Sequence, residues 1–208
     1  MSSGSSAGSA APAARSTADE RTGRVLDAME SRLARSGIRA VVMSELAREL
    51  GMSTRTLYRT FPSKDALVLA VVERWADQLA DAQERRLHSD MSAEERIRTA
   101  VRFLDDRRRR FCDAFWDDLR VDHPDAWHRY RSMVAAARRR SIEWTVPALH
   151  PGLDPVFART LLTAMVERAR QPETLAAAGM SREQALDAAV AIWSRGAFVD
   201  PDAPPPLA

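Results

Sequence analysis

Residues 43–67 read MSELARELGMSTRTLYRTFPSKDAL, and this stretch decides the fold of the N-terminal part of the chain. Leu46, Ala47 and Leu50 fall on one side of a short helix. Gly51 follows, and glycine readily adopts the left-handed backbone conformation that closes a helix and that most residues resist. The stretch therefore begins with a short amphipathic helix that ends in a tight turn.

A second short helix is expected at residues 54–61, directly after this turn. Ser53 is a good N-cap for it, and Leu57 and Phe61 share its apolar face. Pro62 ends the helix because proline lacks the amide proton that continues the hydrogen-bond ladder. Two short helices joined by a tight turn form a helix-turn-helix, whose second helix enters the major groove of DNA.

The outward face of the second helix carries groups that bind phosphates and base edges. Arginine makes paired hydrogen bonds to guanine, and threonine contacts a thymine methyl group or a phosphate. We expect DNA contacts from Thr54, Arg55, Thr56, Tyr58 and Arg59. A solvated surface helix is the alternative, but the cap, the turn and the apolar face agree with one another and favour DNA binding.

This stretch resembles the TetR family of transcriptional regulators. The matching residues are Leu46-Ala47, Gly51, Ser53, Thr56-Leu57-Tyr58, Phe61, Ser63-Lys64 and Leu67, after an amphipathic helix that ends near Gly37. The resemblance implies a three-helix DNA-binding head and a larger helical body that dimerises and holds an effector. By the family's pattern, Tyr58 and Lys64 bind backbone phosphates, and Ser44 and Thr60 also reach DNA. The chain departs from the family at Val42, where a threonine often opens the first helix of the motif and supplies a cap and a phosphate contact.

The remainder of the chain also has a helical pattern. Residues 63–123 and 125–146 contain neither glycine nor proline, whereas an all-β chain needs frequent turn residues. Apolar residues recur at intervals of three and four, as at Val25, Met29 and Leu33. Stop signals separate the helices at Gly37, Gly51, Pro62, Pro124, residues 147–155, Pro172 and Gly179. The pattern predicts an all-α protein of about nine helices, with an N-terminal three-helix helix-turn-helix domain and a larger C-terminal helical bundle.

Composition divides the chain into four parts. Residues 1–14 are rich in Ser, Gly and Ala and are expected to form a disordered tail, as are the Pro-rich residues 200–208. Residues 15–64 form the predicted DNA-binding domain, with ten basic and six acidic residues. Residues 65–199 form the predicted effector-binding and dimerisation domain. A basic head on a less basic body suggests a polyanion-binding function for the head alone.

Aromatic and methionine residues gather in the middle of the body. Two interpretations remain open, namely ordinary core packing and an apolar cavity that binds a small molecule. The candidate ligand-binding residues are Phe103, Phe111, Phe115, Trp116, Trp127, Tyr130, Met133, Trp144 and Met165.

Two late amphipathic helices, at residues 154–168 and 181–195, combine small and large apolar residues. In the TetR family, two late helices of each subunit form a four-helix dimer interface, whereas the alternative is packing within one chain. The candidate interface residues are Leu161, Met165, Ala185, Ala189, Ile192 and Trp193.

Other classes of function receive little support from the sequence. The longest apolar run has seven residues, the start of the chain lacks the features of a signal peptide, and Cys112 is the single cysteine. No P-loop, GxGxxG or GxSxG pattern is present, and His123 and His128 favour capping of a helix junction over a metal site. We therefore expect a cytoplasmic protein that is not an enzyme, has no cofactor and no metal, and does not bind a membrane.

The sequence thus predicts a transcriptional regulator, with repression favoured, that binds a pseudo-palindromic DNA operator as a homodimer. A small and largely apolar effector would release it from DNA. Two alternatives remain open: a small all-α enzyme with a purely structural helix-turn-helix, and a DNA-binding dimer without an effector.

Overall fold

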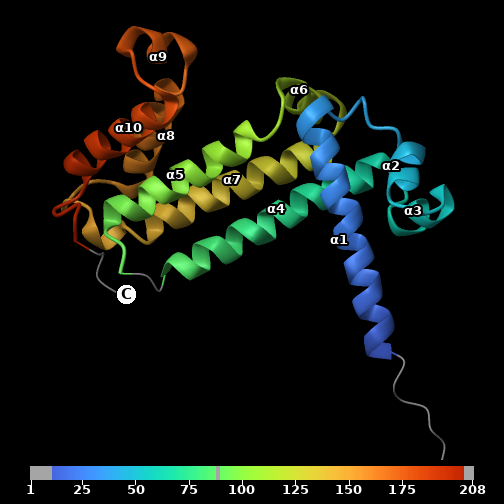
Figure 1. The fold of residues 1–208 in the computed structure, drawn as a ribbon. Coiled ribbons are helices and arrows are strands. Elements are labelled where there is room, and N and C mark those ends of the chain that lie inside the picture. The colour runs from blue at the N-terminus through green and yellow to red at the C-terminus, as the bar shows by residue number, and fades with distance from the viewer. Residues whose placement is uncertain (1–10, 88–89, 204–208) are drawn as a thin grey trace, which may run out of the picture. The chain divides into compact units, whose positions relative to one another are not determined.

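The computed structural model describes residues 11–87 and 90–203, which are helical apart from turns and one isolated antiparallel bridge between Leu149 and Phe198. The helices are α1 (Ala11–Ser36), α2 (Met43–Glu49), α3 (Thr54–Thr60), α4 (Lys64–Leu87), α5 (Ala93–Arg109), α6 (Asp113–Asp122), α7 (Pro124–Glu143), the 3-10 turn η1 (Val146–Ala148), α8 (Pro155–Ala169), α9 (Pro172–Ala178) and α10 (Arg182–Ala197) (Figure 1). The all-α prediction is confirmed.

Two details differ from the sequence prediction. The described residues contain ten α-helices where about nine were expected, and the short α9 lies between the two stop signals Pro172 and Gly179. Helix α1 begins at Ala11, so residues 11–14 of the expected disordered tail are helical. Residues 1–10 and 204–208, which make up the rest of the two expected tails, lie outside the described residues. None of the described helices has the length and apolar character needed to cross a bilayer.

The chain divides into two compact units. Unit 1 contains residues 1–73 and 111–127, and unit 2 contains residues 74–110 and 128–208. The boundary expected after residue 64 divided the chain into consecutive segments. It therefore assigned residues 111–127 to the C-terminal domain, whereas in the structure they belong to unit 1. Helix α6 brings them there by packing against α1.

The core of unit 1 joins α1 to the helix-turn-helix. Met29 and Leu33 of α1 are fully buried, as are Leu46 of α2 and Leu57 of α3. Arg32 on α1 donates through Nε to Glu49 at the end of α2, over 2.9 Å. Apolar burial and this ion pair hold α2 against α1.

The core of unit 2 lies where α8 and α10 pack with α5. Ile97, Leu162 and Val190 are buried together with Trp193 and Phe198. The Trp193 indole donates to the carbonyl oxygen of Ala158 at 3.0 Å, and its ring packs edge-on against Phe198. The indole therefore ties α10 to α8 within one chain.

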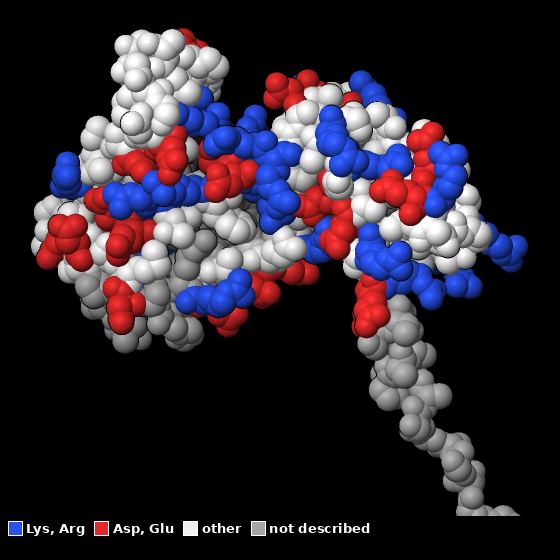
Figure 2. Space-filling model, viewed as in Figure 1, with Lys and Arg blue, Asp and Glu red and all other residues white. Residues whose placement is uncertain are grey.

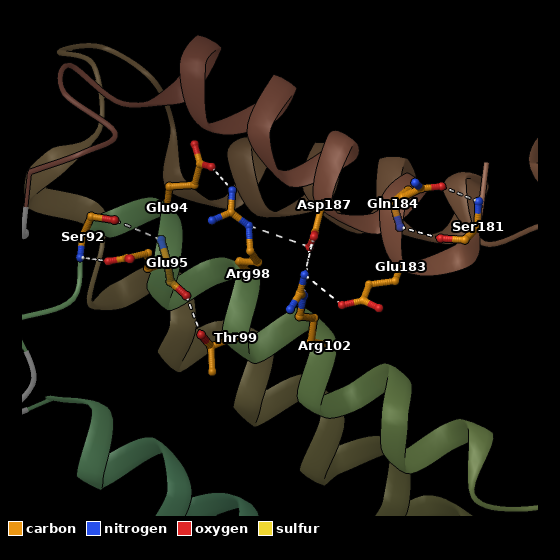
Figure 3. Close-up of polar contacts among 10 residues, drawn as sticks. All are labelled: Ser92, Glu94, Glu95, Arg98, Thr99, Arg102, Ser181, Glu183, Gln184 and Asp187. Carbon is orange, nitrogen blue, oxygen red and sulfur yellow. Dashed lines mark hydrogen bonds and ion pairs between the residues drawn. The ribbon is translucent and has the colours of Figure 1, made fainter. Parts of the chain in front are cut away.

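A polar network joins the outer sides of α5 and α10 (Figure 3). Asp187 on α10 lies between Arg98 and Arg102 of α5, and Arg102 also pairs with Glu183 at 3.1 Å. Acidic and basic side chains accordingly interleave over this part of the surface (Figure 2). The two helices begin with capping boxes at Ser92 and Ser181, in which each serine and the residue three positions later satisfy one another's backbone amides.

Candidate nucleic-acid interface

The turn of the helix-turn-helix has the predicted geometry. Gly51 has φ +65°, and its amide donates to the carbonyl oxygen of Arg48 at the end of α2. The Met52 amide donates to the carbonyl oxygen of Ala47 at 3.0 Å, which closes the last turn of α2. Met52 and Ser53 connect Gly51 to the start of α3 at Thr54.

Helix α3 is capped and stopped as predicted. The Ser53 hydroxyl accepts from the Thr56 amide at 3.1 Å, and Leu57 is fully buried beneath the helix. The helix ends before Pro62, and the Ser63 hydroxyl accepts from the Ala66 amide at 3.0 Å to start α4. Local sequence thus sets both ends of α3, and burial of Leu57 fixes which side faces outward.

The outward side of α3 presents cationic, hydroxyl and aromatic groups. Thr54, Arg55 and Arg59 are exposed. Tyr58 is also exposed, with 44% of its surface accessible to solvent, which is unusual for a large aromatic side chain. Of the five residues that the sequence selected on this face, four are exposed and Thr56 is half-buried. The face supplies hydrogen-bond donors for phosphates and base edges on one side of a rigid helix.

Two of the expected DNA-contacting threonines already make bonds within α3. The Thr56 hydroxyl lies 2.8 Å from the Ser53 hydroxyl and is half-buried, while the Thr60 hydroxyl donates to the Thr56 carbonyl at 3.3 Å. Thr56 therefore belongs to the cap of the helix. A DNA contact from either hydroxyl remains a prediction.

Helix α2 presents Ser44 outward, next to an N-terminus without a side-chain cap. Ser44 is exposed, and its contact with DNA remains a prediction. Val42 occupies the N-cap position with extended backbone angles, and it supplies no oxygen for the first amides of the helix. The departure from the family's usual threonine thus has a local structural consequence.

The ammonium of Lys64 points to the protein backbone in this structure. Its Nζ donates to the carbonyl oxygen of Ile38 at 3.2 Å, in the segment between α1 and α2. An ammonium has three protons, so this bond leaves donors for a phosphate. The contact predicted between Lys64 and DNA remains a prediction.

A carboxylate that the sequence analysis did not select holds the segment between α1 and α2. Asp118 of α6 is buried, and its Oδ2 accepts from the amides of Ile38 at 2.8 Å and Arg39 at 2.9 Å. The Arg39 guanidinium lies 3.3 Å from Asp118 Oδ1 and 2.7 Å from Asp122 Oδ2. No sequence signal identified Asp118, because the residues that it binds lie 79 and 80 positions away.

The expected ligand-binding aromatics do not form one pocket. Phe111, Phe115 and Trp116 are buried in unit 1, where the rings of Phe111 and Phe115 lie 4.6 Å apart, so they are core residues there. Phe103 lies beside the Arg107 guanidinium in unit 2, with 5.8 Å between Cζ and the ring centroid. Tyr130 lines a hollow between α5, α7 and α8.

The other candidates lie at several places. Met133 lines a separate hollow with residues of α4, and Met165 packs against the core of α5, α8 and α10. Trp127 and Trp144 are half-buried near the two ends of α7. The sequence-selected set is therefore dispersed, because apolar periodicity does not distinguish a core position from a cavity wall.

Five of the six expected dimer residues are either exposed or buried, and Met165 is half-buried. Leu161 and Ile192 are 45% and 63% exposed. Ala185, Ala189 and Trp193 are buried within unit 2 of the same chain. Sequence reasoning omitted Val156 and Phe157, which are each 60% exposed on α8.

The histidine expected at a helix junction lies at the end of α6. His123 is its C-cap residue, and its Nδ1 lies 2.8 Å from Asp65 Oδ1 in unit 1. Among the described residues, no three His, Cys, Asp or Glu side chains form a group suited to a metal ion.

Comparison with known proteins finds relatives of the segment that contains the helix-turn-helix. Residues 25–71 match the model of the family described as bacterial regulatory proteins, tetR family, which confirms the resemblance over this segment. The HTH-type transcriptional activator FasR of Mycolicibacterium smegmatis is 36% identical over 83 residues, which span 40% of this chain and 38% of that protein.

Solved structures extend the likeness to the whole fold. A proposed transcriptional regulator from Saccharomonospora viridis, in complex with choline, has a TM-score of 0.67 at 20% identity, over 88% of this chain and all of that one. SmeT, the repressor of the Stenotrophomonas maltophilia multidrug efflux pump SmeDEF, has a TM-score of 0.62 at 17% identity, over 89% and 94% of the two chains. The chain therefore combines a helix-turn-helix head with the helical body seen in these structures.

Proposed function

We propose that this chain, whose residues 25–71 match the tetR-family model, is a cytoplasmic transcriptional regulator that binds DNA through α3. The observation that carries the proposal is the exposed face of Thr54, Arg55, Tyr58 and Arg59 on a helix capped by Ser53. Arg55 and Arg59 are the side chains proposed to read base edges. Tyr58 and Lys64 are proposed to bind phosphates, with Ser44 at the start of α2 beside them.

The proposed active form is a homodimer on a pseudo-palindromic operator. Val156, Phe157, Leu161 and Ile192 supply exposed apolar side chains on α8 and α10, and such patches commonly mark protein interfaces. A two-fold dimer presents two copies of α3 to successive major grooves, about 34–36 Å apart. The symmetry of the dimer then requires two related half-sites in the DNA.

We propose repression, with release by a small and largely apolar effector bound in unit 2. Occupying an operator blocks a promoter without any further partner, so repression is the simplest outcome of DNA binding alone. An effector acts only if it binds the DNA-free conformation more tightly than the DNA-bound one. The similar proteins include an activator, FasR, and a repressor, SmeT, so the sign of regulation needs a direct test.

The test is footprinting of genomic DNA with the purified protein, followed by binding to the recovered site over a range of salt concentrations. We expect a protected pseudo-palindrome. Arg55→Ala and Arg59→Ala should each weaken binding to the preferred site by about 1–3 kcal/mol and relax the preference at the base that the arginine reads. Lys64→Gln should weaken binding to all sequences and lower the salt slope by about 1.

Arg168→Ala is the matched control, because Arg168 is an exposed arginine paired with Glu173 on unit 2. It should leave both the affinity and the preference for the operator unchanged. Lack of preference for any genomic sequence would contradict the proposal and favour the structural helix-turn-helix. A reporter gene fused to the footprinted promoter then shows whether deletion of the regulator raises or lowers expression.

A further inference from the structure

Unit 2 contains two hollows between α5, α7 and α8 that share part of their lining, and we treat them as the apolar part and the charged part of one hollow. The apolar part has a volume of about 60 Å³, and its walls include Val101, Leu104, Leu162 and Val166. The charged part has a volume of about 300 Å³. Leu104, Arg138 and Arg170 line both parts, so the two parts adjoin each other.

The charged groups around this hollow are mostly positive. Its described lining includes five arginines, at positions 108, 131, 138, 159 and 170, and two acids, Asp105 and Glu167. Asp105 is already neutralised, because the Arg182 guanidinium binds both of its oxygens over 2.6–3.1 Å. Glu167 lies 3.4 Å from Arg138 and 3.6 Å from Arg170, so one carboxylate serves two guanidiniums. The lining therefore holds more positive charge than its own acids neutralise.

Arg170 is partly buried, with 21% of its side chain exposed. Burial lowers the pKa of Arg170, and the nearby charge of Arg108 lowers it further. Both effects oppose the charged guanidinium, and an anion in the hollow would relieve both. Burial also raises the pKa of Tyr130, and its hydroxyl stays protonated at neutral pH.

Two arginines on the other side of α5 differ from this lining in how they are paired. Arg98 pairs with Glu94 and Asp187, and Arg102 pairs with Glu183 and Asp187 (Figure 3). Both arginines on that side are thus paired with acidic residues of the same chain. The contrast distinguishes the lining of the hollow from an ordinary solvated and salt-bridged face.

We infer that unit 2 binds an organic anion with a compact apolar tail, its head between Arg138 and Arg170 and its tail against Val101, Leu162 and Val166. Guanidinium groups bind carboxylates and phosphates through paired, charge-assisted hydrogen bonds. The small apolar part limits the tail to one unbranched alkyl chain or a single ring. This inference names the chemical class of the effector and changes it from a largely apolar molecule to one with a charged head, and its regulatory meaning rests on the proposed function.

The test compares ligands that share a tail and differ in charge. Calorimetric titration of the full chain uses octanoate, octyl phosphate, octanol and octylamine, with benzoate as a second anion of different shape. We expect at least one of the three anions to bind, with octanol and octylamine binding at least about tenfold more weakly than the anion of the same tail. The comparison of octanoate with octyl phosphate identifies the preferred head. Equal affinity for octanol, or no binding of any of the three anions, would overturn the inference.

Variants then locate the site. Arg138→Gln and Arg170→Gln should each weaken binding of the anion about tenfold without changing the affinity for octanol. Arg168→Gln is the matched control, since Arg168 lies in the last turn of α8, two residues before Arg170, and pairs with Glu173 outside the hollow. Circular dichroism establishes that each variant is folded, and equal weakening by Arg168→Gln would overturn the assignment.

These titrations contain no DNA, so they separate the inference from the proposed function. Anion binding by a protein that recognises no operator would contradict the regulator proposal and leave the site in place. Operator binding by a protein that takes none of the anions would overturn the inference and leave the regulator proposal in place.

Discussion

The buried carboxylate of Asp118 accepts a hydrogen bond of 2.8 Å from the amide of Ile38, across 80 residues of sequence. The same oxygen accepts from Arg39, and the Arg39 guanidinium pairs with Asp118 and Asp122. Helix α6 thereby fixes the segment that leads from α1 into the helix-turn-helix. The backbone amides between α1 and α2 are therefore hydrogen-bonded by a side chain of α6. This helix follows α4 and α5 in the chain but belongs to unit 1.

Asp118→Ala should destabilise the protein by about 2–3 kcal/mol, because two amides then lose a charged acceptor. Asp118→Asn should cost less, since an amide oxygen still accepts the bond from Ile38 while the charge opposite Arg39 is removed. Urea unfolding measures both changes. Equal stability of the wild type and the Ala variant would contradict the role assigned to Asp118.

Gly37 and Gly51 allow a matched test of backbone and packing effects. Both have positive φ, +77° and +65°, which costs an L-residue about 1–2 kcal/mol. A Cβ on Gly51 would meet nothing within 4 Å, whereas one on Gly37 would lie 2.9 Å from Asp118 Oδ2 and 3.3 Å from the backbone of Ala114.

Gly51→Ala should therefore show the backbone cost alone, and Gly37→Ala should be clearly less stable than Gly51→Ala. Thermal unfolding of the two variants checks the order. The reverse order would mean that the approach of α6 to Gly37 does not constrain the fold.

Val42→Thr should stabilise the protein by about 1 kcal/mol. The residue already has extended backbone angles, and a threonine hydroxyl at the N-cap accepts from an amide in the first turn of α2. Val42→Ala is the control, because it removes a half-exposed side chain and adds no acceptor. Chemical unfolding of both variants distinguishes a cap from a general effect of replacing valine.

Ile192→Glu and Leu161→Glu should shift the proposed dimer toward monomer. Each change places a charge on an exposed apolar position of α8 or α10. Because a two-fold interface contains the same patch of both subunits, it would contain that charge twice. Val121→Glu is the matched control, because Val121 is 61% exposed on α6 of unit 1 and Ile192 is 63% exposed.

Sedimentation velocity over a range of protein concentrations measures this effect. Dissociation by Val121→Glu alone would move the proposed interface away from α8 and α10. Unchanged sedimentation of all three variants would contradict the interface, provided that the wild type is dimeric.

Local patterns in the sequence determined the helix-turn-helix almost completely. Gly51, Ser53 and Pro62 act on backbone groups within four residues of themselves, and Leu57 fixes the inward side of α3 by its hydrophobicity alone. The exposed face of Arg55, Tyr58 and Arg59 follows from helical periodicity. Interactions of such short range are encoded where they occur, and the sequence therefore predicted them.

Tertiary structure alone decided which distant residues meet. The contact of Asp118 with Ile38 and the burial of Trp193 depend on how helices pack, and many packings agree with the same apolar spacing. The aromatics expected to bind a ligand fell largely into the core for this reason. The arginines around the hollow of unit 2 come from α5, α7 and α8, so their shared excess of charge exists only after those helices have come together.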